Sequence, residues 1–262
     1  MDKPLAVVPV SALDDNYVWL LAPAPPFHAD GSGGQAACVD PGEAAPVLAY
    51  LHAHGLTLAQ IWITHHHRDH TGGIAELKRR FPACTVYGGS GIDEADITVG
   101  EGDRIRFAGR TVRVWHIPGH TDGHLAYLLE EGGRTYVFCG DTLFSAGCGR
   151  VFTGTPQQLA ASCRRLGSLP DDTLVFPAHE YTAANLAFAA FIEPDNPDTA
   201  AARQQAARTP TLPVTLAHER RINPFLRTAE PAVARRAAEL AGRVLPDETA
   251  VFTALRELKN GF

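Results

Sequence analysis

The residues with the most chemical potential stand together in one short segment, which reads THHHRDH. Within it His65, His67, Asp69 and His70 form the spacing His-x-His-x-Asp-His. Imidazole nitrogens and carboxylate oxygens at this density are typical ligands of divalent transition metals. Because alternate residues of an extended segment point the same way, we expect His65 and His67 to face one site and His66 to face away from it.

Three further candidate ligands, His120, Asp141 and His179, each follow an apolar segment that predicts a strand. These strands are expected at residues 112–117, 135–138 and 174–176. Loops at strand ends are where sites are usually built, so we expect the three groups near one sheet edge. Five imidazoles and two carboxylates exceed the roughly three protein ligands of one catalytic zinc. They suit two metals that share a carboxylate and activate a water, with zinc favoured and iron or manganese compatible.

Each histidine taken alone is also compatible with a hydrogen-bonded core residue, and only the complete set argues for a metal centre. We interpret His124 as a structural residue or a support for the ligands. Five cysteines without a Cys-x-x-Cys pair predict reduced thiols rather than a disulfide framework or a thiolate zinc site. The chain has no P-loop and no Gly-x-Ser-x-Gly nucleophile elbow.

The elements that must position these residues change in character along the chain. Residues 1–180 alternate short apolar strands with helices, which predicts a mixed α/β body. Residues 181–262 are Ala-rich with helical spacing, which predicts a packed helical domain. The helices expected there cover residues 183–192, 197–207, 231–241 and 247–259. Helices are also expected at residues 45–54, 74–80 and 156–166.

Composition excludes several classes of protein. The net charge is −6 and Lys and Arg form no run longer than three residues, which argues against nucleic-acid binding. No apolar stretch reaches about 18 residues, so we expect no membrane span. The first residues lack the pattern of a secretory signal, so we expect a cytoplasmic protein. We also expect it to be a monomer that acts on a small molecule.

The sequence resembles the metallo-β-lactamase superfamily, and within it the glyoxalase II (hydroxyacylglutathione hydrolase) family. The resemblance spans nearly the whole chain and is strongest in six segments. They are THHHRDHTGG (64–73), PGHTDGH (118–124), CGDTLFSAGCGR (139–150), PAHEYTAAN (177–185), NPFLR (223–227) and LRELKN (255–260). It implies an α+β fold, an αββα sandwich followed by a C-terminal all-helical domain, with a catalytic domain at 1–180 and a glutathione-binding domain at 181–262.

The resemblance also assigns residues. It implies one metal on His65, His67 and His120, and a second on Asp69, His70 and His179. Asp141 would bridge the two metals, and Asp69 and Asp141 would orient the attacking water. The implied glutathione contacts are Arg150, Phe152, Tyr181, Arg256 and Lys259. Phe152 stands where some relatives carry an aromatic hydroxyl, so it can pack on the ligand but cannot donate a hydrogen bond.

The implied activity is hydrolysis of S-(2-hydroxyacyl)glutathione, with S-D-lactoylglutathione as substrate. Four alternatives are weighed against it. A β-lactam hydrolase often carries Cys where Asp141 stands, and a persulfide dioxygenase uses one iron and does not need the helical tail. A nuclease would need a basic surface. A metal-binding or sensing module without turnover would not need two metals around a water.

Overall fold

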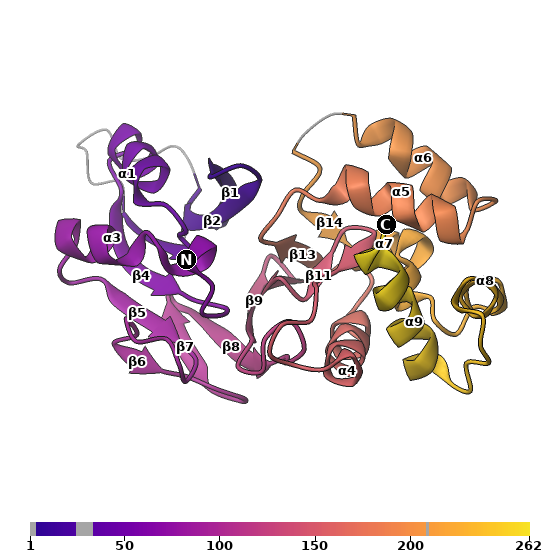
Figure 1. The fold of residues 1–262 in the computed structure, drawn as a ribbon. Helices are drawn as coiled ribbons and strands as arrows, with labels where there is room; N and C mark the ends of the chain where they lie inside the picture. Colours follow the sequence, from indigo (N-terminus) through magenta and orange to yellow (C-terminus); the bar gives the residue numbers. More distant parts are fainter. Residues whose placement is uncertain (1–3, 25–33, 208–209) are drawn as a thin grey trace. The chain divides into compact units, whose positions relative to one another are not determined.

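The structure is a computed structural model that describes residues 4–24, 34–207 and 210–262 (Figure 1). The chain divides into two compact units, each built from two segments. The first unit comprises Met1–His116 and Gly123–Gly140, and the second comprises Ile117–Asp122 and Asp141–Phe262. The domain boundary expected between residues 180 and 181 stays a prediction.

In its described part, the first unit begins with a six-stranded mixed sheet, in the order β1-β2-β3-β4-β5-β6. Its strands are β1 (Leu5–Ala12), β2 (Asn16–Pro23), β3 (Gln35–Val39), β4 (Thr57–Trp62), β5 (Thr85–Gly88) and β6 (Ile97–Thr98). The strands β1, β2 and β3 pair antiparallel, whereas β3 to β6 pair parallel. Helices α1 (Ala44–Ala53) and α3 (Ile74–Arg80) share an apolar core with these strands, through Val47, Leu51 and Leu77.

A second, antiparallel group of strands completes the first unit, in the order β10-β9-β8-β7. They are β7 (Arg104–Phe107), β8 (Arg110–His116), β9 (Leu125–Glu131) and β10 (Arg134–Gly140). The ring of Trp62 on β4 lies 5.8, 5.7 and 6.2 Å from those of Phe107, Tyr127 and Phe138. The Tyr127 hydroxyl donates to the carbonyl of Ile63 at 2.7 Å. The two sheets therefore face each other across an aromatic core, as the sandwich requires.

The second unit is mainly helical. Its elements are β11 (Leu143–Phe144), β12 (Gly147–Cys148), α4 (Pro156–Gly167), β13 (Leu174–Pro177), α5 (Thr182–Ile192), α6 (Pro197–Gln205), β14 (Val214–Thr215), α7 (Leu216–Ile222), the 3₁₀ turn η1 (Pro224–Leu226), α8 (Pro231–Ala241) and α9 (Glu248–Asn260). The sequence did not signal β14 and α7, because the short α7 directly follows an extended, Pro-containing segment. No helix in the described ranges is both long and apolar enough to cross a bilayer.

All five cysteines lie in described parts of the chain, and all are free and buried. They are Cys38, Cys84, Cys139, Cys148 and Cys163. Burial raises the pKa of the Cys84 thiol to about 11 and holds that of Cys38 well above its ordinary value. The expectation of thiols that form no disulfide framework is confirmed.

The hairpin formed by β11 and β12 is fastened to the helices by a fully buried carboxylate, Glu219 on α7. Glu219 accepts hydrogen bonds from the Ser145 hydroxyl and the Ala146 amide, both at 2.8 Å. Asn223 donates a third at 3.0 Å and also donates to two carbonyls of the hairpin. Burial outweighs these bonds and raises the pKa of Glu219 from 4.5 to about 7.

This shift predicts a stability that falls with rising pH. The folded chain keeps the Glu219 proton to higher pH than the unfolded chain, so the group destabilises the fold as pH rises from about 4.5 to about 7. The loss reaches about 3 kcal/mol for a shift of this size. In Glu219→Gln, denaturant unfolding over this pH range will lack that slope. The exposed Glu76→Gln control will retain it, and a Glu219→Gln variant with the wild-type slope would contradict the assignment.

Candidate metal centre

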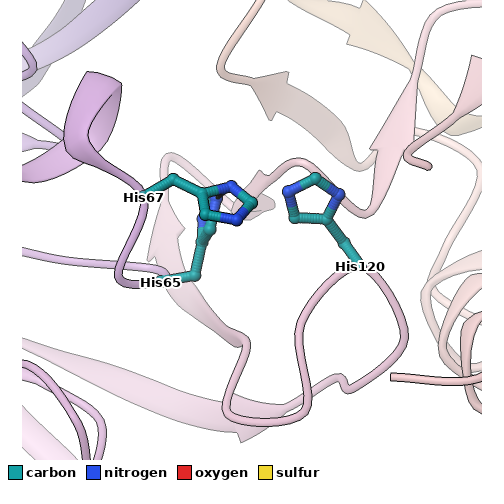
Figure 2. Close-up of side chains that lie close together, drawn as sticks. All are labelled: His65, His67 and His120. Atoms are coloured by element: carbon teal, nitrogen blue, oxygen red, sulfur yellow. Dashed lines mark hydrogen bonds between the residues drawn. The ribbon is translucent and has the colours of Figure 1, made fainter. Parts of the chain in front are cut away.

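The first unit carries four of the sequence-predicted ligands on the loop between β4 and α3, which includes the single turn α2 (Arg68–Thr71). His65 Nε2 lies 2.9 Å from His67 Nδ1, and the two rings are nearly perpendicular (Figure 2). His70 Nε2 lies 3.4 Å from Asp69 Oδ2. His66 is exposed, in agreement with the expected alternation. The nitrogen and oxygen atoms that could bind a metal therefore lie close together on this loop.

A buried carboxylate that sequence analysis did not single out, Asp40, organises this loop. Asp40 follows β3 and accepts from the backbone amide and hydroxyl of Thr64, at 2.8 and 2.7 Å. Its Oδ2 also lies 3.1 Å from His70 Nδ1. Since the Thr64 hydroxyl donates to Asp40, it accepts from Nδ1–H of His65, 3.0 Å away. This assigns the tautomer of His65 in which Nε2 keeps its lone pair for a metal.

His124 and Gly140 pack tightly against the loop that carries the predicted ligands. The His124 ring stacks on that of His65, with centroids 4.7 Å apart, and is fully buried. Gly140, at the end of β10, has φ +48°, and a Cβ there would meet the Thr64 hydroxyl at 2.4 Å and His124 at 2.9 Å. Only glycine fits this position, so the chain can reach Asp141 without displacing the His65 support.

The second unit carries the other three predicted ligands. The buried Asp141 carboxylate lies between two imidazoles, with Oδ2 3.5 Å from His120 Nε2 and Oδ1 3.3 Å from His179 Nε2. His120 Nδ1 donates to the carbonyl of Arg150 at 2.8 Å, so Nε2 is the nitrogen whose lone pair can bind a metal. One carboxylate oxygen directed at each imidazole is the arrangement that a bridging ligand needs.

Two of the predicted glutathione contacts are exposed aromatic rings beside these ligands. Phe152 is 61% exposed and makes an edge-to-face contact with His120, with centroids 5.1 Å apart. Tyr181 is 37% exposed and stacks almost parallel on His179 at 4.7 Å. Each ring therefore exposes apolar surface beside a predicted metal-binding histidine, and a substrate can pack against this surface.

The three predicted cationic contacts differ in their surroundings. Arg150 is exposed, whereas Arg256 is buried and donates to the carbonyls of Cys148 and Gly149 at 2.9 and 3.2 Å. Lys259 donates to the side chain of Asn185. Burial, followed by the charge of Arg256, lowers the pKa of Lys259 to about 8. Arg256 thus contacts the hairpin backbone, while Lys259 loses its charge at a pH only slightly above neutral.

Comparisons with known proteins agree with this arrangement of fold and ligands. The family model for the metallo-beta-lactamase superfamily matches residues 31–179, and that for the hydroxyacylglutathione hydrolase C-terminus matches residues 180–262. A crystal structure of ETHE1 from Myxococcus xanthus is similar, with a TM-score of 0.61 and 26% identity over 97% of both chains. The di-iron-bound form of TTHA1623 has a TM-score of 0.57 and 28% identity, over 84% of this chain and all of that one.

The chain has the fold of the metallo-β-lactamase superfamily, and its histidine and aspartate donors are suited to divalent metals. Curated relatives narrow this class. One from Neisseria gonorrhoeae is 55% identical over 98% of this chain and 100% of its own, and one from Vibrio parahaemolyticus is 46% identical with the same coverage. Both are named hydroxyacylglutathione hydrolase. The chain belongs to the hydroxyacylglutathione hydrolase (glyoxalase II) family.

The contacts of Asp40 predict that it tunes metal affinity without being a ligand. Asp40→Asn keeps the side-chain size but removes the charge that orients His65 and His70. Loss of such a supporting group typically weakens metal binding by 10- to 100-fold. Competition with a chelator will report this loss. The exposed Glu43→Gln variant, three residues further along the same loop, will keep wild-type affinity, and unchanged affinity in Asp40→Asn would contradict the role.

Proposed function

We propose that this protein hydrolyses S-(2-hydroxyacyl)glutathione thioesters, with S-D-lactoylglutathione as substrate and D-lactate and glutathione as products. This reaction is the second step of methylglyoxal detoxification. The observation that carries the proposal is the full-length similarity to relatives named hydroxyacylglutathione hydrolase. The match of residues 180–262 to the C-terminus of that family favours it over a β-lactam hydrolase or a dioxygenase.

We propose that the seven predicted donors hold two metals. His65, His67 and His120 would hold one metal, and Asp69, His70 and His179 the other. Asp141 would bridge them, which its position between two imidazoles supports. We propose zinc as the metal, while the di-iron-bound relative supports iron as an alternative. When bound, such metals lower the pKa of a water and polarise the carbonyl that it attacks.

The remaining chemistry needs little from the protein side chains. The leaving group is the glutathione thiolate, whose conjugate acid has a pKa of about 8.5, so it departs without a strong general acid. Asp69 and Asp141 are proposed to orient the attacking water as well as to hold metal.

The glutathione part of the substrate is proposed to bind the second unit, with residues 181–262 as the glutathione-binding domain. Phe152 and Tyr181 would pack against it beside the ligands. Arg150 and Lys259 would attract its carboxylates, while Arg256 acts by holding the backbone at Cys148 and Gly149. We further propose a monomeric, cytoplasmic enzyme.

The first experiment is steady-state hydrolysis of S-D-lactoylglutathione by purified protein, with metal content measured on the same sample. Rapid loss of the thioester with about two metals per chain is expected. Asp141→Asn is expected to lose most of its activity and part of its metal. A fully metallated wild type without hydrolysis would overturn the proposed function, and full activity in Asp141→Asn would overturn the bridging role.

The pKa of Lys259 predicts a pH dependence of substrate binding. Because its pKa is about 8, the ammonium charge is present below that pH and is lost as pH rises through it. KM should therefore rise above pH 8 in the wild type. Lys259→Arg keeps its charge and should flatten this rise, whereas Lys78→Arg at a remote surface pair should not. Identical KM profiles for wild type and Lys259→Arg would contradict a binding role.

A further inference from the structure

Leu13 is a leucine at a position where neither the backbone conformation nor burial in the core favours one. It begins the three-residue turn between β1 and β2, with φ +52°. This left-handed conformation disfavours leucine, whereas glycine, asparagine and aspartate adopt it readily. The side chain is also 53% exposed, so little of it contributes to the core. A large apolar side chain that is half exposed on a strained turn is accessible to a bound molecule.

The turn that carries Leu13 is tied to the ligand loop. Asn16 closes the turn by pairing with Ala12, and its buried amide donates to Asp69, at 3.2 Å to the backbone oxygen and 3.4 Å to Oδ2. The amide of Leu13 itself lies 3.3 Å from Glu43 Oε2. The loop of Glu43 packs on Asp69 as well, because a Cβ at Gly42 would meet the Asp69 carbonyl at 1.9 Å.

The proposed function leaves the acyl group without an assigned contact. None of the proposed glutathione contacts is assigned to it, and its carbonyl must lie near proposed metal ligands such as Asp69 of the first unit. Among the described residues of that unit, the exposed large apolar side chains are Leu13 and Ile97. Ile97 lies on β6, at the opposite edge of the sheet from β1, whereas the turn that carries Leu13 is bonded to Asp69 through Asn16.

We propose that Leu13 is a specificity-determining residue, which contacts the substituent on C2 of the 2-hydroxyacyl group. The inference rests on the proposed function and deepens it, because it assigns the acyl preference to one side chain. Leu13 favours substrates with an apolar C2 substituent over those that carry only hydrogen there. This contact accounts for a leucine at a position whose backbone conformation disfavours it.

The test compares kcat/KM for S-D-mandeloylglutathione and S-glycolylglutathione in the full-length, metal-loaded enzyme. Leu13→Gly and Leu13→Asn both suit the left-handed backbone and remove the apolar side chain. We expect the mandeloyl-to-glycolyl ratio to fall about tenfold in both, the usual effect of losing an apolar contact in a pocket. Ala108→Gly is the matched control, because Ala108 also has a positive φ, of +46°, but lies in the turn between β7 and β8.

The outcomes distinguish failure of the Leu13 contact from failure of the proposed function. A tenfold lower ratio in both Leu13 variants, with a wild-type ratio in Ala108→Gly, supports the contact. An unchanged ratio in either Leu13 variant overturns it, while hydrolysis of both thioesters by the wild type leaves the proposed function intact. If the metal-loaded wild type hydrolyses neither thioester, the proposed function fails and this inference falls with it.

Discussion

The hydrogen bonds that the Asp40 carboxylate accepts hold the loop of predicted ligands in the first unit. This carboxylate is buried at the end of β3 and receives hydrogen bonds from the backbone and hydroxyl of Thr64 and lies against His70. A buried carboxylate without such partners would be costly, so these contacts fix the loop in one conformation. They also determine which nitrogen of His65 carries the proton, because the Thr64 hydroxyl donates to Asp40 and therefore accepts from Nδ1–H of His65. One anion thus sets both the position and the chemistry of two imidazoles.

The second unit solves the same problem with another buried carboxylate. Glu219 holds the β11–β12 hairpin, whose continuation reaches Arg150, and the carbonyl of Arg150 fixes the tautomer of His120. Asn223 and Arg256 bind further carbonyls of the same hairpin. The helices of this unit therefore act on a ligand through the backbone of a short hairpin. This gives a physical reason for helices to accompany the proposed ligands His120, Asp141 and His179 within one compact unit.

Much of this architecture could be predicted from local sequence signals. Helices α3 and α8 lie at the bounds expected, since both are delimited by Pro or Gly and have clear apolar spacing. The strands that precede His120, Asp141 and His179 were also expected, because each is a short apolar run and a small residue stands directly before each of these side chains. The fold class followed from these elements together with the family resemblance.

What could not be predicted depends on contacts between distant residues. Asp40 lies 24 residues before Thr64, and no local pattern distinguishes it from an ordinary turn aspartate. The spacing of Arg256 and Lys259 shows that they share a helix face, but not that Arg256 is buried against carbonyls. The left-handed backbone at Leu13 was likewise invisible, because leucine is not a residue that signals such a turn.

The burial of all five thiols has a consequence for an enzyme whose proposed product is itself a thiol. Exchange with glutathione disulfide requires an accessible thiolate that can approach the sulfur–sulfur bond in line. Buried side chains deny that approach, and the high pKa values of Cys38 and Cys84 keep those two sulfurs protonated. Burial of its thiols therefore protects the chain against forming mixed disulfides with the glutathione that it is proposed to release.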